Sequence, residues 1–331
     1  MFKFIKTSFM ALGVFATVAY AEIPSSSARL ADGSKSAGVW EAGAQSTLSR
    51  NSGGNVEATK EKLMRALGLP EASRAEITPG TVLSHGADWV LDVWDNGNAG
   101  AFRKERGANP AKLEPKAIPA KREIVDVALG ALRTRLAGHF ALGKDETLVL
   151  LAVHAEFAGS QENKEGAPRV EHVMGWEVTF GRAVGGRLVL GGGSHIRLGF
   201  DARGELESLH FDWPSYSNSA RRVTTASKAT VDQRVKAMKA KLPKNTKITE
   251  EELECGWVDV GVRPGDRSQG VSELVPGCQL RMVMQTADAS SKNTFTSGVI
   301  EFISALEKEE PLPSSRESAP PPAPPPPAPN K

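Results

Sequence analysis

The sequence predicts an α+β protein in which helices pack on antiparallel meander sheets. Two observations lead to this prediction. Residues 175–213 alternate apolar and polar side chains in short runs separated by glycine-containing turns, the pattern of half-buried strands in a meander. Residues 120–139 carry apolar side chains at helical spacing along one stripe. Because a sheet with one apolar face needs a cover, we expect this helix to pack across the meander.

Within the meander, the alternation predicts short strands joined by tight turns. Gly185-Gly186 supplies a turn in which positive backbone dihedrals carry little steric cost. The step from Leu206 to Leu209 breaks the alternation, which indicates a β-bulge. The expected strands are 176–180, 188–190, 196–200 and 206–213.

The remaining elements follow from caps, breakers and periodicity. A first helix is expected after Asn55, a fair N-cap, and it ends at Gly68. Thr230 and Gln233 have the spacing of a capping box, which predicts a third helix that ends before Pro243. Further strands are expected at 89–93, 147–157, 255–262, 279–285 and 294–304, and surface loops at 101–120 and 159–169.

Residues 1–21 have the pattern of a secretory signal peptide. Two lysines precede an apolar run at 9–18, and Ala19-Tyr20-Ala21 follows as an A-x-A cleavage site. The run is too short to span a bilayer of roughly 30 Å as a helix, although an uncleaved anchor is the alternative. We therefore expect a mature chain that begins at Glu22, has no transmembrane segment and is exported to the periplasm or the medium.

Composition bounds the domains and the partners. The signal holds two of the 41 basic residues and no acidic residue, so 39 basic face 39 acidic side chains in the mature chain, and charge gives no argument for nucleic acid. Residues 22–54 are rich in Ser, Gly and Ala, which predicts a flexible lead-in. We expect an α+β domain at 55–220, a second α+β domain at 221–307 and a disordered proline-rich tail at 308–331.

The two cysteines, Cys255 and Cys278, are expected to form a disulfide, because export places both in an oxidising compartment. Two free thiols and a metal site are the alternatives. The metal site is disfavoured because no second Cys or His lies at short spacing beside either residue.

Residues 175–206 resemble the propeptide module that precedes thermolysin-like and fungalysin-like metalloproteases. The matching residues are 176–180, Gly185-Gly186, Val189, Gly191-Gly192, 196–200 and Asp201-Ala202-Arg203-Gly204. Within this segment, Arg187-Leu188 replaces the Ile-Pro that usually precedes the Val. Residues 230–305 are similar to the PepSY module that commonly accompanies the propeptide module. The resemblance implies cystatin-like units without a peptidase domain, and a role in folding, inhibiting or binding a partner.

Catalytic motifs find little support in the sequence. None of the six histidines begins an H-E-x-x-H motif. Ser194 and His195 are neighbours on an expected strand and would point to opposite faces, so we interpret Gly193-Ser194-His195 as a turn. The carboxylates Glu156 and Glu177 are candidates for an acid and base pair that spacing cannot bring together. The sequence thus offers no catalytic, cofactor-binding or metal-ligating set of residues.

Two hypotheses for function remain open. The first is a secreted, non-catalytic binding or inhibitory module whose partner is an extracellular protein such as a protease, and whose contact surface is a sheet edge or the meander face. The second is an exported hydrolase with an unrecognised site. Residues 221–247 hold nine basic side chains and one acid, which would allow weak contact with an anionic surface, although the solvated face of a helix explains them better.

Overall fold

The computed structural model describes residues 30–31, 42–105, 119–160, 170–259, 273–287 and 294–308. The expected signal peptide, most of the lead-in and all but the first residue of the expected tail lie outside the described residues. The α-helices are α1 (Val56–Leu67), α2 (Lys121–Thr134) and α3 (Lys228–Lys239). The strands are β1 (Leu30–Ala31), β2 (Gly43–Arg50), β3 (Arg74–Thr78), β4 (Thr81–His85), β5 (Trp89–Trp94), β6 (Ala99–Lys104), β7 (Glu146–Ser160), β8 (Val170–Val184), β9 (Arg187–Leu190), β10 (His195–Asp201), β11 (Leu206–Asp212), β12 (Tyr216–Thr225), β13 (Thr246–Val258), β14 (Glu273–Ala287) and β15 (Thr294–Ser304).

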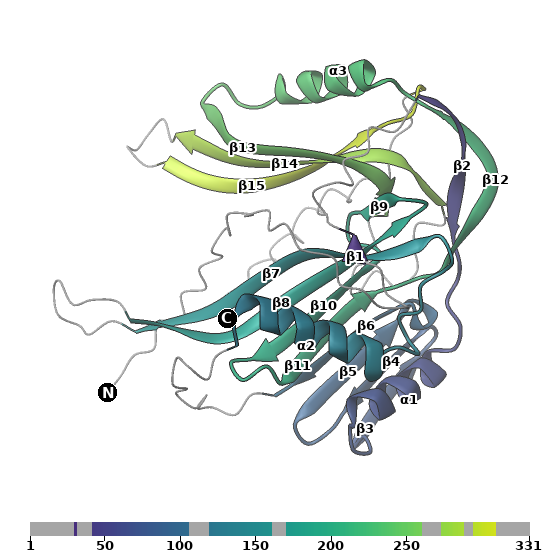
Figure 1. Ribbon diagram of the computed structural model, residues 1–331, viewed down its shortest axis with the longest axis vertical. Helices are drawn as coiled ribbons and strands as arrows, with labels where there is room; N and C mark the ends of the chain where they lie inside the picture. The colour runs from purple at the N-terminus through teal and green to yellow at the C-terminus, as the bar shows by residue number, and fades with distance from the viewer. Residues whose placement is uncertain are drawn as a thin grey trace, which may run out of the picture.

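Backbone hydrogen bonds connect these strands into a 15-stranded sheet. Its main path runs β12-β2-β14-β13-β9-β8-β10-β11-β6-β5-β4-β3, while β7 joins at β8 and β15 joins at β14. Figure 1 shows two layers, an upper one of β13, β14 and β15 beneath α3, and a lower one from β7 to β3 that carries α1 and α2. The short strand β9 links the layers, because it pairs with β8 on one side and with β13 on the other.

The expected fold class was wrong. The chain does not form small cystatin-like units with helices packed on separate meanders, but a large fold dominated by its sheet, with three α-helices among the described residues. The individual strands of the meander were predicted well. What the sequence pattern could not show is that β13 pairs in parallel with β9 through Trp257 and Val189, which merges the expected units into one sheet.

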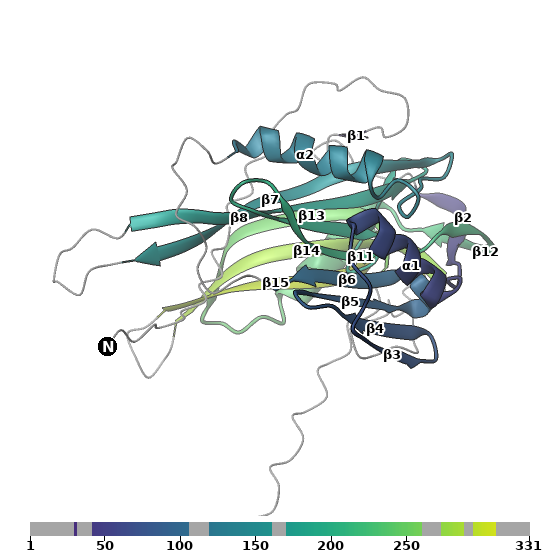
Figure 2. The same cartoon turned by 90° about the horizontal axis from the view of Figure 1, so that it is seen from below.

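The lower layer has the larger core. Helices α1 and α2 cover one face of this layer, as Figure 2 shows from below. Asn55 caps α1 through its side chain, and Gly68 ends it in the left-handed conformation, as predicted. The apolar stripe of α2, including Ile124 and Leu129, packs with Phe180 and Leu198 of the meander in one buried cluster. The expectation that this helix covers the central sheet is therefore confirmed.

The upper layer carries α3 and the disulfide. Val231 and Val235 of α3 pack with Leu280 and Met282 of β14. The cap of α3 was misplaced by the sequence, because Ser227 and not Thr230 is the N-cap residue. Cys255 and Cys278 form the predicted disulfide between directly opposite residues of β13 and β14.

Like the two-residue β1, the strands β2 and β6 lie where the sequence predicted irregular structure. β2 occupies part of the expected flexible lead-in, where Leu48 and Thr47 are buried between β12 and β14. β6 occupies the start of the expected loop at 101–120 and pairs with β5 and β11. Both strands are short or polar in sequence, and their pairing partners determine their conformation. The predicted bulge in β11 is confirmed, since the register slips where Phe200 pairs with Leu206 and Gly199 with Ser208.

Candidate functional site

A buried group of charges lies where the two layers meet. The guanidinium of Arg50, at the end of β2, contacts three carboxylates, those of Asp95 at 2.7 Å, Asp212 at 2.9 Å and Asp259 at 2.9 Å. The Arg50 side chain is 3% exposed, and that of Asp259 is fully buried. Burial lowers the pKa of Arg50, but the neighbouring acidic groups, above all Asp212 and Asp259, together offset this effect and raise the pKa above its ordinary value.

A second arginine extends this group along β8. Arg182 donates to the Glu146 carboxylate at 3.1 Å and to the Ser194 hydroxyl at 2.8 Å. Its guanidinium also lies over the rings of Trp213, at 4.3 Å, and Tyr216, at 4.5 Å. Glu146, Arg182 and Ser194 thus form one arm of a polar network that continues through Tyr216.

Tyr216 joins the two arginine groups. Its hydroxyl donates to the Asp259 carboxylate at 2.6 Å and also contacts the Ser194 hydroxyl at 2.6 Å. Burial raises the pKa of Tyr216 well above its ordinary value, and the neighbouring Asp259 raises it further. We name the residues Arg50, Asp95, Glu146, Arg182, Ser194, Asp212, Tyr216 and Asp259 the junction network.

The glycine run 191–193 packs around Asp259. A Cβ on Gly193 would lie 2.2 Å from the Asp259 carboxyl carbon, and one on Gly191 would lie 2.3 Å from its backbone oxygen. The Gly193 N–H donates to that backbone oxygen at 2.9 Å. The glycines are therefore required by the close approach of Asp259, in agreement with the interpretation of Gly193-Ser194-His195 as a turn.

Ser194 and His195 face different groups, as the sequence predicted. The Ser194 side chain, in a residue that is 1% exposed, contacts Arg182 and Tyr216. His195 instead contacts His210, with 3.1 Å between its Nε2 and the His210 Nδ1. No histidine is in position to activate the Ser194 hydroxyl, so this pair has no arrangement for nucleophilic catalysis.

The two histidines are held in a neutral state. Burial, together with the neighbouring His210 and Arg197, lowers the pKa of His195 to about 4. Burial and Arg197 also lower the pKa of His210. Because one neutral imidazole must donate and the other accept across their contact, the pair is a hydrogen bond between uncharged rings at neutral pH.

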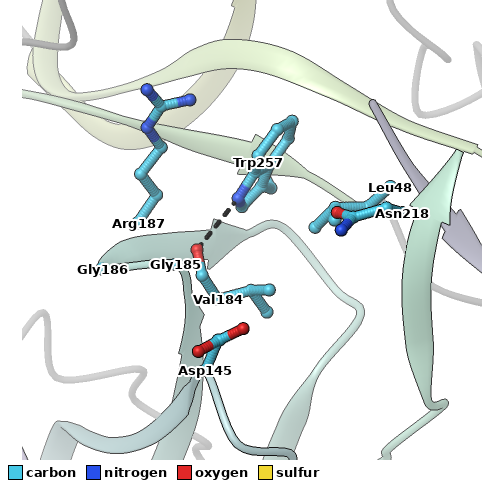
Figure 3. Close-up of a pocket in the computed structure, with 8 residues that line it drawn as sticks. All are labelled: Leu48, Asp145, Val184, Gly185, Gly186, Arg187, Asn218 and Trp257. Atoms are coloured by element: carbon cyan, nitrogen blue, oxygen red, sulfur yellow. Dashed lines mark hydrogen bonds between the residues drawn. The ribbon is translucent and has the colours of Figure 1, made fainter. Parts of the chain in front are cut away.

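A shallow hollow of about 420 Å³ opens beside the junction network. Figure 3 shows its lining: Leu48, Asp145, Val184, Gly185, Gly186, Arg187, Asn218 and Trp257. The Trp257 indole N–H donates to the Val184 carbonyl at 3.2 Å, and the Arg187 guanidinium lies 5.5 Å from the centre of the Trp257 ring. The lining brings no acid and base pair together, and it includes none of the histidines.

The basic stretch 221–247 spans several elements of the fold. It is divided among β12, α3 and β13. Several of its charges have partners: Arg221 pairs with Glu273 at 2.7 Å, and Lys228 pairs with Asp232 at 2.6 Å. Arg234 donates to the backbone carbonyl of Ser304 at 2.7 Å, which anchors α3 to the end of β15.

Of the two candidate carboxylates, Glu177 pairs with Arg197 at 3.4 Å and lies opposite His154 in the sheet.

β15 is an edge strand of the upper layer. All 11 of its residues pair with β14, and among the described strands it has no second neighbour. The Ala305 N–H donates to the Pro276 carbonyl at 3.3 Å, and Ser304 directs its carbonyl to Arg234 instead. Because hydrogen-bonded pairs alternate along an antiparallel ladder, the backbone groups of Gly298, Ile300 and Phe302 point to the open side.

The side chains of β15 do little to protect this edge. Glu301 is the one charged residue in the strand, and Ile300 is 56% exposed. Natural edge strands are usually short, charged, bulged or covered, because an open row of backbone groups invites another strand to pair. β3 is an edge strand of the usual kind, with five residues, two of which are the charged Arg74 and Glu76.

Sequence reasoning predicted the strand at 294–304 but not its position at an edge, which depends on the order of strands in the sheet. It also missed the junction network, whose eight members each lie on a different strand, turn or loop. The glycine run beside Ser194 was the one visible signal, because it marks a close backbone approach.

Within the described ranges, no group of three or more His, Cys, Asp or Glu residues is placed to hold a metal ion, and no helix has the length and apolar character to cross a membrane. No family model matches the sequence, and no curated protein matches it. A solved structure of an uncharacterised protein from Eubacterium rectale is similar with a TM-score of 0.45 and 11% identity, over 82% of this chain and 86% of that chain.

Proposed function

We propose that the protein is an exported, non-catalytic binding module that captures an extended segment of another protein along β15. The observation that carries the proposal is the outer edge of this strand, which is long, carries a single charge and pairs with no second strand among the described residues. A segment that pairs with it gains main-chain hydrogen bonds, while alternate side chains supply specificity. The expected partner is an extracellular protein such as a protease.

Two features of the junction support a binding role over a catalytic one. The Ser194 hydroxyl, a candidate nucleophile in the sequence, is buried and engaged with Arg182 and Tyr216. The junction network also links β2, β8, β12 and the end of β13, so it holds the two layers together. A rigid frame behind an open edge favours binding, because the edge then loses little conformational freedom when a partner pairs with it.

Export is part of the same proposal. The disulfide between Cys255 and Cys278 is consistent with an oxidising compartment, and residues 1–21 have the pattern of a signal peptide. A partner should therefore be sought in the extracellular or periplasmic fraction of the native cells.

The test is a pull-down from that fraction with the mature chain, residues 22–331, and two variants. Ile300→Lys places a protecting charge on the β15 edge. Ile77→Lys is the matched control, because Ile77 is 61% exposed on the other edge strand, β3. We expect a partner that the mature chain and Ile77→Lys retain and Ile300→Lys loses, with all three chains giving the same circular dichroism spectrum.

Two results would contradict the proposal. Partners that Ile300→Lys retains as well as the unaltered chain does would show that the β15 edge is not the contact surface. Turnover of peptide, ester or glycoside substrates by the mature chain alone would support the hydrolase hypothesis in its place.

A further inference from the structure

We infer that the captured segment places a lysine or arginine opposite Glu301, between two apolar residues that face Ile300 and Phe302. This inference rests on the proposed function and states the chemistry of the partner. It follows from the two faces of β15 and from the charge that the strand carries.

The two faces of β15 have different surroundings. Val299 and Ile303 pack with the cluster beneath α3, so the odd-numbered side chains of the strand lie on the α3 side. Phe302 packs, on the opposite side of the upper layer, against a cluster made of Val149 of β7, Ala183 of β8 and Leu188 and Leu190 of β9. Because side chains alternate along a strand, Ile300 shares the face of Phe302, and Glu301 shares the α3 side.

A strand added beside β15 would continue both faces. Cross-strand neighbours lie about 4.5–5.5 Å apart at their Cβ atoms, which is contact distance for apolar side chains. The added strand therefore meets Ile300 and Phe302 with two residues at alternate positions. Since Ile300 is 56% exposed before binding, apolar residues there would remove its side chain from water.

The residue between these two positions lies opposite Glu301. Glu301 is exposed, and it forms no ion pair with another described residue. An opposite charge placed directly across from it is favourable, whereas a like charge is unfavourable. The complementary segment thus has the order apolar, basic, apolar.

The same charge argues against a second copy of this chain as the occupant. β15 has the sequence TFTSGVIEFIS, which contains no lysine, arginine or histidine. A second β15 pairing with the first could therefore offer Glu301 only neutral residues or another glutamate. Charge complementarity therefore argues against pairing of two β15 strands, and we assign the segment to a different protein.

The test uses two fluorescein-labelled peptides of alternating valine and threonine, one with a central lysine and the other with a glutamate at that position. Fluorescence anisotropy measures the affinity of each peptide for the mature chain and for three variants. We expect the lysine peptide to bind about fivefold more tightly to the mature chain, because cross-strand charge pairs have effects of this size. Glu301→Lys should reverse the preference, Ile300→Lys should abolish binding of both peptides, and Ile77→Lys should change neither.

The outcomes separate this inference from the proposed function. If the two peptides bind with equal affinity and Ile300→Lys abolishes the binding of both, the inferred basic residue of the partner is overturned, while strand addition at β15 stays supported. Failure of both peptides, together with a pull-down that Ile300→Lys does not alter, would overturn both. Light scattering that finds a dimer of the mature chain but a monomer of Ile300→Lys would identify a second copy as the occupant and overturn the inference.

Discussion

Arg50 and Asp259 lie 209 positions apart in the sequence, and their buried side chains meet at 2.9 Å. Arg50 ends β2, and Asp259 follows directly after β13. The pair therefore links the N-terminal part of the described chain to the strand that carries the disulfide. Asp212 and Tyr216, which also contact this pair, come from the end of the meander and the start of β12. The junction network thus connects the two layers.

Replacing Arg50 should destabilise the protein strongly. Arg50→Met would leave Asp212 and Asp259 buried without their cation, and loss of one partner of a buried ion pair typically costs about 3–5 kcal/mol. Urea unfolding, followed by tryptophan fluorescence, measures the change. Arg74→Met is the control, since the Arg74 side chain is 71% exposed in its pair with Glu76 and should contribute less than about 1 kcal/mol. Equal effects of the two substitutions would contradict the role given to the junction network.

The glycine that touches Asp259 should tolerate no side chain. In Gly193→Ala the new Cβ would overlap the Asp259 carboxylate, which cannot shift without weakening its contact with Arg50. We expect a loss of about 1–3 kcal/mol in the free energy of unfolding. Gly130→Ala in α2 should instead stabilise by up to about 1 kcal/mol, because nothing lies near that position and alanine favours a helix. Thermal unfolding of both variants checks the sign of each change, and a stable Gly193→Ala protein would refute the close packing.

His195 should make stability depend on pH. Its pKa is about 4 in the folded chain and about 6.5 in the unfolded chain, so the unfolded chain binds more protons between these values. The free energy of unfolding should therefore fall as the pH decreases from about 6.5 toward 4, by up to roughly 3 kcal/mol from this residue. In His195→Asn this decrease in the free energy of unfolding should be smaller. His154→Asn, a substitution at an exposed position, should leave the decrease unchanged. Urea unfolding at several pH values makes the comparison, and identical slopes for His195→Asn and the unaltered chain would contradict it.

The disulfide between Cys255 and Cys278 should stabilise the folded protein. The 23-residue separation of Cys255 and Cys278 corresponds to about 3 kcal/mol in the chain-entropy account of cross-links. The double variant Cys255→Ala, Cys278→Ala should unfold at lower urea concentration than the oxidised chain. Dithiothreitol should not change the stability of the double variant, whereas it should lower the stability of the unaltered chain. No change on reduction of the unaltered chain would show that β13 and β14 are held by their other contacts alone.

Local features of this fold could be predicted from the sequence. The cap at Asn55, the left-handed Gly68, the strands of the meander and the bulge near Leu206 each depend on a few neighbouring residues, and all are present. The disulfide was also predictable, because two cysteines leave one possible pairing.

Pairing between distant segments could not be predicted in this way. The strand β2 has few large apolar residues, and its burial depends on β12 and β14, which follow more than 160 residues later. The parallel contact of β9 with β13 likewise leaves no local pattern, and it is this contact that joins the expected units into one sheet. The open edge at β15 is a consequence of that strand order, so the proposed binding surface was visible only in the structure.

The central claim, that the outer edge of β15 is open to another strand, is tested most directly by residue-resolved amide hydrogen exchange of the mature chain. The Val299 and Glu301 amides point to β14 and should exchange slowly, whereas the Gly298 and Ile300 amides point outward and should exchange fast. Adding the lysine peptide should slow the Gly298 and Ile300 amides and leave the others unchanged. Equally slow exchange at all four positions in the chain alone would show that the edge is already covered and would contradict the account.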